Sequence, residues 1–493
     1  MTDLVSTAVF GALLLAGVGV GEALRAWAGW RPESSRRAVH ATTGTLVALC
    51  PLWFDGPVGI YALAALFVLV NLWAVPRGVF GGMHGIERRS WGTVTFPLAL
   101  LLALVGCWTL DEGRVFALQA AFLALAWADP AASLFGSRYG KRRYRLGRAE
   151  KSWVGSAACF AVTFGCVALV LALTEQPGSW TLWAGAALVA AGLATAAEAL
   201  GGEGWDNLGI VLAVATPLVA LYEGAELSLL LTALGVAVAF GLASYRVRFL
   251  DASGALAAGL LAFGVLALGG WAWAVPGFTF FLTGSLLSKG RERVAGDAQV
   301  RAEKGSRRDA GQVLSNGGVA GALLIAHAYW PWDGLYWGYA AAFAAAAADT
   351  WATEIGTWRR GQTRLVWSGR RVPPGTSGGV SVAGTLGALL GAGVVFASLI
   401  PFASPYVGGL GWGRAAAVVV AGGFCAALVD SVLGATLQAR YRDARGSLTE
   451  ARPAPDARPE RGLDWLDNDR VNLACTLAGG ALGIGGLLAL QAL

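Results

Sequence analysis

The stretch AADTWATEIG at residues 347–356 carries two carboxylates at the end of a long apolar run, and VPPGTSGGVS at 372–381 follows it. A run of alanines ends at Asp349, and Glu354 stands five residues later. A basic loop, 358–371, separates the two stretches. A carboxylate in an apolar segment of membrane length is costly, so it marks a candidate functional site.

The composition around this stretch indicates an integral membrane protein. Of the 493 residues, 56% are hydrophobic and only 14% are charged, whereas soluble domains carry roughly 25% charged residues. Apolar runs of transmembrane length recur from end to end. The 70 glycines lie within those runs, where small residues let helices pack closely. We therefore exclude a soluble protein with one large core.

Other compositional features narrow the function classes. The six cysteines form no CxxC pair and no Cys/His cluster, which predicts small buried side chains and no zinc site or disulfide. The net charge is +6, but the basic residues stand in loops between apolar runs, so nucleic acid is not an expected partner. The first apolar run lacks a basic leader and a cleavage-like site, which predicts a retained span.

The fold class predicted from the apolar runs is an all-α, polytopic membrane protein with about 16 transmembrane helices in two related eight-helix halves. The predicted domains are residues 1–222 and 223–493. The expected spans are 4–24, 38–54, 57–75, 93–110, 115–135, 153–173, 180–200, 207–222, 226–243, 254–269, 272–288, 312–329, 335–355, 377–402, 412–438 and 471–492.

The loops between these spans alternate in charge. One set is basic and the other contains no Lys or Arg. Because basic loops stay on the cytoplasmic side, the alternation predicts cytoplasmic basic loops and both termini outside. The basic set is 31–37, 77–89, 141–151, 245–249, 289–308, 359–371 and 438–445.

The polar clusters fall at the predicted cytoplasmic ends of the spans. Asp129 ends an apolar span, and Ser133, Gly136 and a run of Lys and Arg follow it. A carboxylate beside clustered cations is typical of Mg²⁺ holding phosphates, with Lys151 adding positive charge. The alternative is that Asp129 caps a helix.

A second cluster adds Glu198, Asp206 and Asn207, three oxygen ligands without a basic residue nearby in sequence. His40 stands at helical spacing from Arg36 and is a candidate general base or a structural histidine. The two clusters together favour a metal–phosphate site.

The second half repeats this order of features as a weak internal repeat. Asp349 and Glu354 correspond to Asp129, and 373–379 to 151–156. No Walker A string is present, so any kinase here is of a membrane type. The remaining correspondences pair Arg307, Arg308, Gln312 and Asn316 with 36–44, and Asp430, Gln438, Asp469 and Asn472 with the Glu198 cluster.

The chain resembles two known families at these motifs. RRAVHATTG (36–44), ADPAASLFGSRYGK (128–141), KSWVGS (151–156) and EALGGEGWDN (198–207) are similar to the phytol kinase and dolichol kinase family. LDASGALAAG (250–259), RRDAGQVLSNGG (307–318), ADTWATEIG, VPPGTSGGVS, DSVLGATLQ (430–438) and NDRVN (468–472) resemble the integral-membrane "domain of unknown function 92" family, whose plant member is a phytyl-phosphate kinase. One departure is the acidic, Pro-rich segment 443–469 before NDRVN.

The resemblance implies two consecutive phosphorylations of a prenyl alcohol (phytol or geranylgeraniol), first to the monophosphate and then to the diphosphate. It implies CTP as donor and Mg²⁺ as cofactor. The implied catalytic residues are Arg37, His40, Lys151, Arg308, Gln312 and Asn316. The implied nucleotide- and phosphate-binding residues are Ser133, Arg138, Lys141, Ser152, Asn207, Arg307, Gly375, Thr376, Ser377 and Asn472. The implied metal ligands are Asp129, Glu198, Asp206, Asp349, Glu354, Asp430 and Asp469.

Two other functions stay open at this point. A cytidylyltransferase would form a CDP-lipid from the same substrates, and a lipid-phosphate transporter would use two multi-span repeats. The expected partners are a membrane lipid alcohol and a nucleotide, with a homo-oligomer as an open alternative.

Overall fold

The computed structural model describes residues 3–77, 91–147, 149–295, 307–358, 361–442, 446, 448–454 and 457–492. It is mostly helical, at 78%. Three small antiparallel sheets also occur in the described loops, and the all-α prediction lacked them. They form because loop segments between helices pair their backbone N–H and C=O groups locally.

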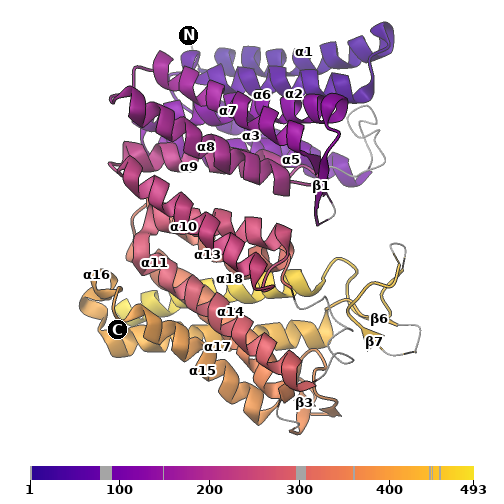
Figure 1. Ribbon diagram of the computed structural model, residues 1–493, viewed down its shortest axis with the longest axis vertical. Coiled ribbons are helices and arrows are strands. Elements are labelled where there is room, and N and C mark those ends of the chain that lie inside the picture. The colour runs from indigo at the N-terminus through magenta and orange to yellow at the C-terminus, as the bar shows by residue number, and fades with distance from the viewer. Residues whose placement is uncertain are drawn as a thin grey trace. The chain divides into compact units, whose positions relative to one another are not determined.

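The chain divides into two compact units, Met1–Gly235 and Val236–Leu493. Figure 1 colours the first unit from indigo to magenta and the second from red to yellow. The elements of the first unit are α1 (Asp3–Ala28), α2 (Pro32–Leu49), α3 (Val58–Ala74), α5 (Gly92–Leu104) with the π-helical turn Val105–Thr109, α6 (Val115–Tyr139), β1 (Arg143–Leu146), β2 (Ala149–Ser152), α7 (Trp153–Leu173), α8 (Trp180–Leu200) and α9 (Asp206–Tyr222).

Helix α10 (Leu227–Arg246) contains the division between the units. The elements that follow are α11 (Ala252–Ala295), α13 (Ala310–Tyr329), α14 (Asp333–Trp358), β3 (Thr363–Leu365), β4 (Arg371–Val372), β5 (Gly379–Val380), α15 (Val382–Leu399), α16 (Ser404–Val407), α17 (Trp412–Thr436), β6 (Tyr441–Arg442), β7 (Leu448–Thr449) and α18 (Asn468–Gln491).

Each predicted span overlaps one of these helices. The two spans expected at 254–269 and 272–288 lie within α11, which is kinked at Gly270. Gly270 has φ 63° and ψ −159°, a conformation that only glycine adopts without strain. Ten helices in the described part are long and apolar enough to cross a membrane. The chain is therefore a polytopic membrane protein, and the number 16 stays a prediction.

The two units repeat one packing arrangement. In the first unit α6 packs against α2, α7 and α9, while α8 packs against α7 and α9. In the second unit α14 likewise packs against α13, α15 and α18, and α17 packs against α15 and α18, but α14 also packs against α17, which α6 does not do to a similar extent against α8. The central helix of each set carries the apolar run that ends in a carboxylate, Asp129 or Asp349.

The two units also have similar residues where the central helix, α6 or α14, meets the start of the next helix, α7 or α15. A Cβ on Gly136 would lie 2.8 Å from Ser152 Oγ, and one on Gly356 would lie 3.2 Å from Ser381 Oγ. Each serine begins the next helix by accepting a hydrogen bond from the backbone N–H three residues on. Asp129 precedes Gly136 by seven residues, as Asp349 precedes Gly356. The structure thus matches Ser152 with Ser381. The sequence pattern had instead matched 151–156 with 373–379, and Ser381 lies just after that stretch.

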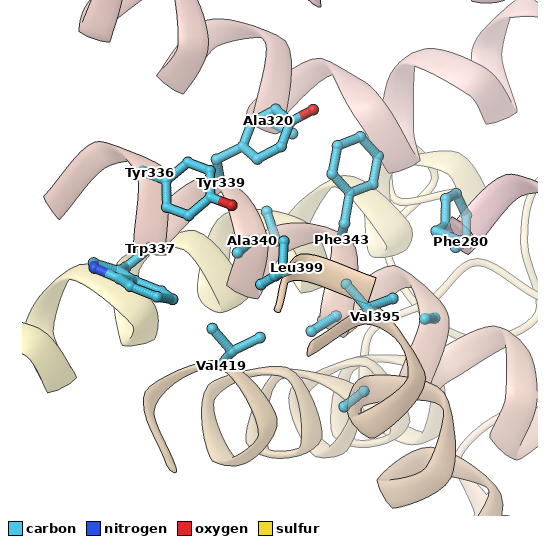
Figure 2. Close-up of a cluster of buried hydrophobic side chains, with 14 of the residues drawn as sticks. Phe280, Ala320, Tyr336, Trp337, Tyr339, Ala340, Phe343, Val395, Leu399 and Val419 are labelled. Carbon is cyan, nitrogen blue, oxygen red and sulfur yellow. The ribbon is translucent and has the colours of Figure 1, made fainter. Parts of the chain in front are cut away.

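The alanine run of α14 lies at the centre of the second unit, and every residue from Gly334 to Ala348 is buried. Glycines of the surrounding helices make this possible: a Cβ on Gly391 or Gly423 would lie 2.7–2.8 Å from the α14 backbone. Small facing residues let helix backbones approach closely. Figure 2 shows part of this core, where aromatic side chains such as Tyr336 and Trp337 lie near Val395, Leu399 and Val419.

Candidate active site

A cavity of about 690 Å³ opens within the first unit, among helices α1, α2, α3, α5 and α6 and the loops at one end of them. This volume falls in the range of small-molecule sites, roughly 300–1,000 Å³. One end is apolar and includes Phe10, Leu14, Val47, Ile60 and Leu100. The other end is polar and holds most of the residues predicted as the first site: His40, Asp129, Ser133, Lys151, Ser152, Glu198, Asp206 and Asn207.

Lys151 and Glu198 form the central ion pair of the polar end. Lys151 Nζ lies 2.6 Å from Glu198 Oε1, and the two side chains are only 20% and 7% exposed. Burial acts to lower the pKa of Lys151, but the carboxylates of Glu198, Asp206 and Asp129 outweigh it and raise that pKa. Lys151 is therefore a permanent cation at neutral pH. Its position comes from the β1–β2 hairpin, in which Lys151 faces Tyr144 across the ladder.

His40 and Asp129 lie together on facing helices α2 and α6. His40 Nε2 is 3.2 Å from the carbonyl oxygen of Leu125 and 3.9 Å from Asp129 Oδ2. Gly44 permits this approach, since a Cβ there would lie 2.7 Å from Ala126 Cβ. When Nε2 donates to Leu125, Nδ1 is the basic nitrogen of the ring. The pair can accept a proton from a hydroxyl in the cavity.

Several predicted site residues make contacts that hold the fold, and of these Arg37 is not among the residues that line the cavity. Arg37 Nε donates to Ser133 Oγ at 3.1 Å. Ser152 Oγ accepts from the Gly155 backbone N–H at 3.0 Å and so begins α7. Asn207 Nδ2 donates to the Gly92 carbonyl oxygen at 3.0 Å. The Asn207 amide therefore links α9 to α5, a structural role that the prediction of phosphate binding did not include.

The exposed basic residues Arg138 and Lys141 do not line the cavity. Two other groups line it that sequence reasoning missed. Arg143 and Glu150 come from the hairpin, and the turn 201–204 contributes Glu203 and three glycines. The glycine spacing in EALGGEGWDN was a signal for this turn, because Gly204 has φ +96° and packs against Gly92.

The second unit brings Asp349 of α14 and Asp430 of α17 into hydrogen-bond contact. Asp430 Oδ2 is buried without a hydrogen-bond partner. Two carboxylates in contact cannot both be ionised unless a cation lies with them, so this pair binds either a shared proton or a cation. The pairing of Asp430 with the alanine-run carboxylate agrees with the repeat proposed from sequence.

Glu354 takes no part in that pair. Its side chain accepts from Ser288 Oγ at 2.7 Å, and Arg291 Nε lies 3.3 Å from it. Five residues on a helix turn through about 140°, so Glu354 and Asp349 point to different sides of α14. The sequence left open which of the two holds a metal; the structure puts Asp349 in the acid pair and Glu354 in an ion pair with α11.

The predicted catalytic residues of α13 have structural partners. Gln312 forms a capping box with Asp309: its N–H donates to Asp309 Oδ1 at 2.9 Å, and its Oε1 accepts from the Asp309 N–H at 3.2 Å. Asn316 Nδ2 donates to the Gln312 carbonyl oxygen at 2.8 Å. The Gln312 amide thus begins a helix, and its predicted catalytic role stays a prediction.

Arg307 and Arg308 precede this helix with different surroundings. Arg307 is exposed, whereas Arg308 lies over the Phe280 ring at 5.5 Å. Burial lowers the pKa of Arg308, and Glu354 acts in the opposite direction. Among the described contacts, Arg308 therefore lies near the ion pair of Glu354 with Arg291 and not near the Asp349–Asp430 pair.

The acidic, Pro-rich segment 443–469 supplies a residue to the second cluster. Glu450 accepts a hydrogen bond from Ser377 Oγ and acts electrostatically on both Asp349 and Asp430. Arg440 donates to the Ser377 carbonyl oxygen at 2.8 Å. Glu450 was missed because its sequence context is only polar and Pro-rich, and Arg440 because it stands among other arginines in the basic loop 438–445.

The other predicted residues of the second half lie on these same elements. Gly375 has φ +84° in a turn, and Thr376 Oγ1 donates to the Pro373 carbonyl oxygen at 2.7 Å. Asp469 Oδ2 lies 2.8 Å from where a Cβ of Gly311 would stand, which places it at the first turn of α13. Asn472 follows Asp469 by three residues on α18, on the same side of the helix.

The fold and the cavity define a polytopic helical membrane protein with buried charged groups at the ends of its helices. The family described as "Integral membrane protein DUF92" matches residues 235–480. Protein PGR of Arabidopsis thaliana is 30% identical over 254 residues, which cover 48% of this chain and 88% of that protein. The chain belongs to the integral membrane protein DUF92 family.

Two further relatives come from Synechocystis. A phytol kinase is 29% identical over 145 residues, or 29% of this chain and 60% of that protein. An uncharacterized membrane protein is 29% identical over 227 residues, or 44% of this chain and 74% of that protein. No solved structure gives a significant match.

Proposed function

We propose that the chain is a bifunctional isoprenoid-alcohol kinase of the membrane. The first unit would transfer a phosphoryl group from a nucleoside triphosphate, CTP by preference, to a prenyl alcohol. The second unit would phosphorylate the resulting monophosphate to the diphosphate. The observation that carries the proposal is that one cavity of the first unit has both a charged end and an apolar end, which suits a substrate with a hydroxyl head and a hydrocarbon tail.

The charge of the cavity bears on the proposed Mg²⁺. Among the described lining residues, His40 apart, seven carboxylates stand against three cations. A triphosphate would enter such a site only with accompanying cations. The carboxylates are Glu22, Glu33, Asp129, Glu150, Glu198, Glu203 and Asp206, and the cations are Arg36, Arg143 and Lys151.

The carboxylates nearest the alcohol position, Asp129 and Asp206, would hold Mg²⁺ in the first unit, and Asp349 with Asp430 would hold it in the second. No three His, Cys, Asp or Glu side chains gather as a complete metal site within the described residues, so phosphate oxygens and water would complete the coordination. When bound, the ion would neutralise charge on the phosphates.

In the first reaction the alcohol oxygen would attack the γ-phosphorus, and a new O–P bond would form. The bond from that phosphorus to the bridging oxygen would break, and its electron pair would leave with the nucleoside diphosphate. The alcohol proton would pass to His40 or Asp129, which lie together at the head of the cavity. Lys151, held by Glu198, would neutralise phosphate charge.

The second reaction needs less acid–base help. A phosphate monoester is largely dianionic near neutral pH, so its oxygen attacks without a base. The second unit has Val380 at the position matched to Lys151, since Ser381 matches Ser152, so it lacks that cation for the phosphates. The acid pair and Glu450 there would act through bound cations.

The proposed orientation follows from the loop charges: the polar ends face the cytoplasm, where nucleotide is present, and both termini lie outside.

The test is a product assay with purified protein, Mg²⁺ and labelled geranylgeraniol or phytol across the four nucleoside triphosphates. We expect monophosphate and then diphosphate, with CDP as co-product when CTP is the donor. Release of pyrophosphate with a CDP-lipid would instead identify a cytidylyltransferase. Nucleotide-independent uptake of lipid phosphate into liposomes, without product formation, would identify a transporter.

A further inference from the structure

The apolar end of the cavity in the first unit is a compartment with a defined length. On α1 the lining residues Phe10, Leu14, Val18 and Glu22 recur every four residues, so they form one stripe along the helix. From the acidic Glu22 to the apolar Phe10 is twelve residues, or about 18 Å of helix.

Helices α2 and α3 show the same gradient. On α2 the lining runs from Glu33 to Val47, and on α3 it runs from Asn71 to Ile60. The first stretch covers fourteen residues, about 21 Å, and the second covers eleven residues, about 17 Å, each with the polar residue at the charged end. The three helices therefore agree on one direction, with depths of about 17–21 Å.

A rigid wall closes the deep end. Phe10 is 1% exposed and packs edge-on against Phe54 and Trp53, with ring centroids 5.5 and 5.7 Å apart. Val47 and Ile60 are each 1% exposed beside it. Close contacts at Gly11 and Gly59 fix α1 against α3 here, because a Cβ on either would meet Leu63 or Thr7 within 3.1 Å.

The depth is shorter than the membrane. A hydrocarbon core is about 30 Å thick, so a compartment of about 17–21 Å ends inside it. None of the described lining residues belongs to the opposite ends of the helices, at 111–114 or 222–226. The cavity therefore has one polar mouth and a closed apolar end.

We propose that this wall sets the length of hydrocarbon tail that the first unit accepts. The tail lies along the α1 stripe with its end against Phe10, Val47 and Ile60, and Ala64 lies beside it partway down. Tails that fill the compartment gain the most from burial, because each buried methylene contributes about fourfold in affinity. The inference rests on the proposed function for the head group, but the wall and its residues are independent of it.

The kinetic test compares geraniol, farnesol, geranylgeraniol and phytol in two variants. Ala64→Phe fills the compartment partway, and we expect kcat/KM for geranylgeraniol to fall at least about tenfold more than that for geraniol. Phe10→Ala opens the wall and should move the preference toward longer tails. Ala65→Phe and Val9→Ala are matched controls, because both positions are exposed on the outer faces of α3 and α1. Equal changes for all four alcohols would overturn the proposal.

A second measurement does not need catalysis. A prenyl alcohol with a diazirine at the end of its tail is photo-crosslinked to the purified wild-type protein, with unlabelled geranylgeraniol as competitor. We expect competed labelling on peptides containing Phe10, Val47 or Ile60. If these peptides are labelled but the protein phosphorylates none of the alcohols, the proposed wall is supported and the kinase activity is refuted. Phosphorylation with labelling elsewhere would refute the wall and sustain the kinase, and absence of both would refute both.

Discussion

Replacing Lys151 by methionine separates its structural role from its proposed chemical one. The 2.6 Å contact with Glu198 corresponds to about 6 kcal/mol of gross attraction at an effective dielectric constant near 20. Desolvation of both groups offsets much of this attraction. Removing the cation alone leaves Glu198 buried and unpaired at 7% exposure, which costs about 3–5 kcal/mol.

The expected signature is a loss of melting temperature of roughly 10 °C, since each kcal/mol is worth about 2–4 °C for a unit of this size. The double variant Lys151→Met/Glu198→Met replaces the pair by apolar side chains and should recover most of that loss. Its kinase activity should nevertheless stay at least about 100-fold below wild type, because the phosphate loses its cation.

The assays are thermal melting in detergent micelles and monophosphate formation from geranylgeraniol. A Lys151→Met protein that melts at the wild-type temperature would refute the energetics of the pair. A double variant with wild-type activity would refute the phosphate role and leave Lys151 as a purely structural cation. Glu198→Gln is the companion variant, since it keeps the Lys151 charge and removes only the carboxylate charge.

Three further outcomes are expected. Asp129→Asn should lower monophosphate formation by about 100-fold or more, whereas Asp349→Asn should leave that step intact and accumulate monophosphate, as chromatography of labelled products would show. Asp333→Asn, at the exposed far end of α14, is the control. Normal diphosphate formation by Asp349→Asn would disprove the second site. The raised pKa of Lys151 means that its pair contributes stability fully below the ordinary lysine value of about 10.4 and loses it as pH rises through the higher folded value; the melting temperature of wild type should therefore fall relative to that of the double variant only in strong alkali, and such a relative fall near neutrality would contradict the assignment. Gly423→Leu should destabilise the second unit by about 1–3 kcal/mol, because its Cβ would lie 2.8 Å from the Ala344 carbonyl carbon, while Gly393→Ala, where nothing lies within 4 Å, should melt like wild type.

Sequence alone determined the helices and the main acids. The apolar runs set the helix bounds to within a few residues at most positions, because transmembrane length and local hydrophobicity depend only on neighbours along the chain. The motif ending in Asp129 and the motif ending in Asp349 could be compared from sequence, since both the apolar run and its terminal carboxylate are local features. The break at Gly270 was also visible as a Gly-Gly-Trp interruption.

Only the tertiary structure decided which polar groups meet. The amides of Gln312 and Asn207 also have backbone and cap partners that sequence spacing does not reveal. Glu450 reaches the Asp349–Asp430 pair from a segment without a motif. The apolar wall at Phe10, Val47 and Ile60 joins three helices that carry no chemical signature there. Such sites depend on side chains distant in sequence converging in space, and hydrophobicity along the chain fixes the length of each helix but not which of its faces meets another.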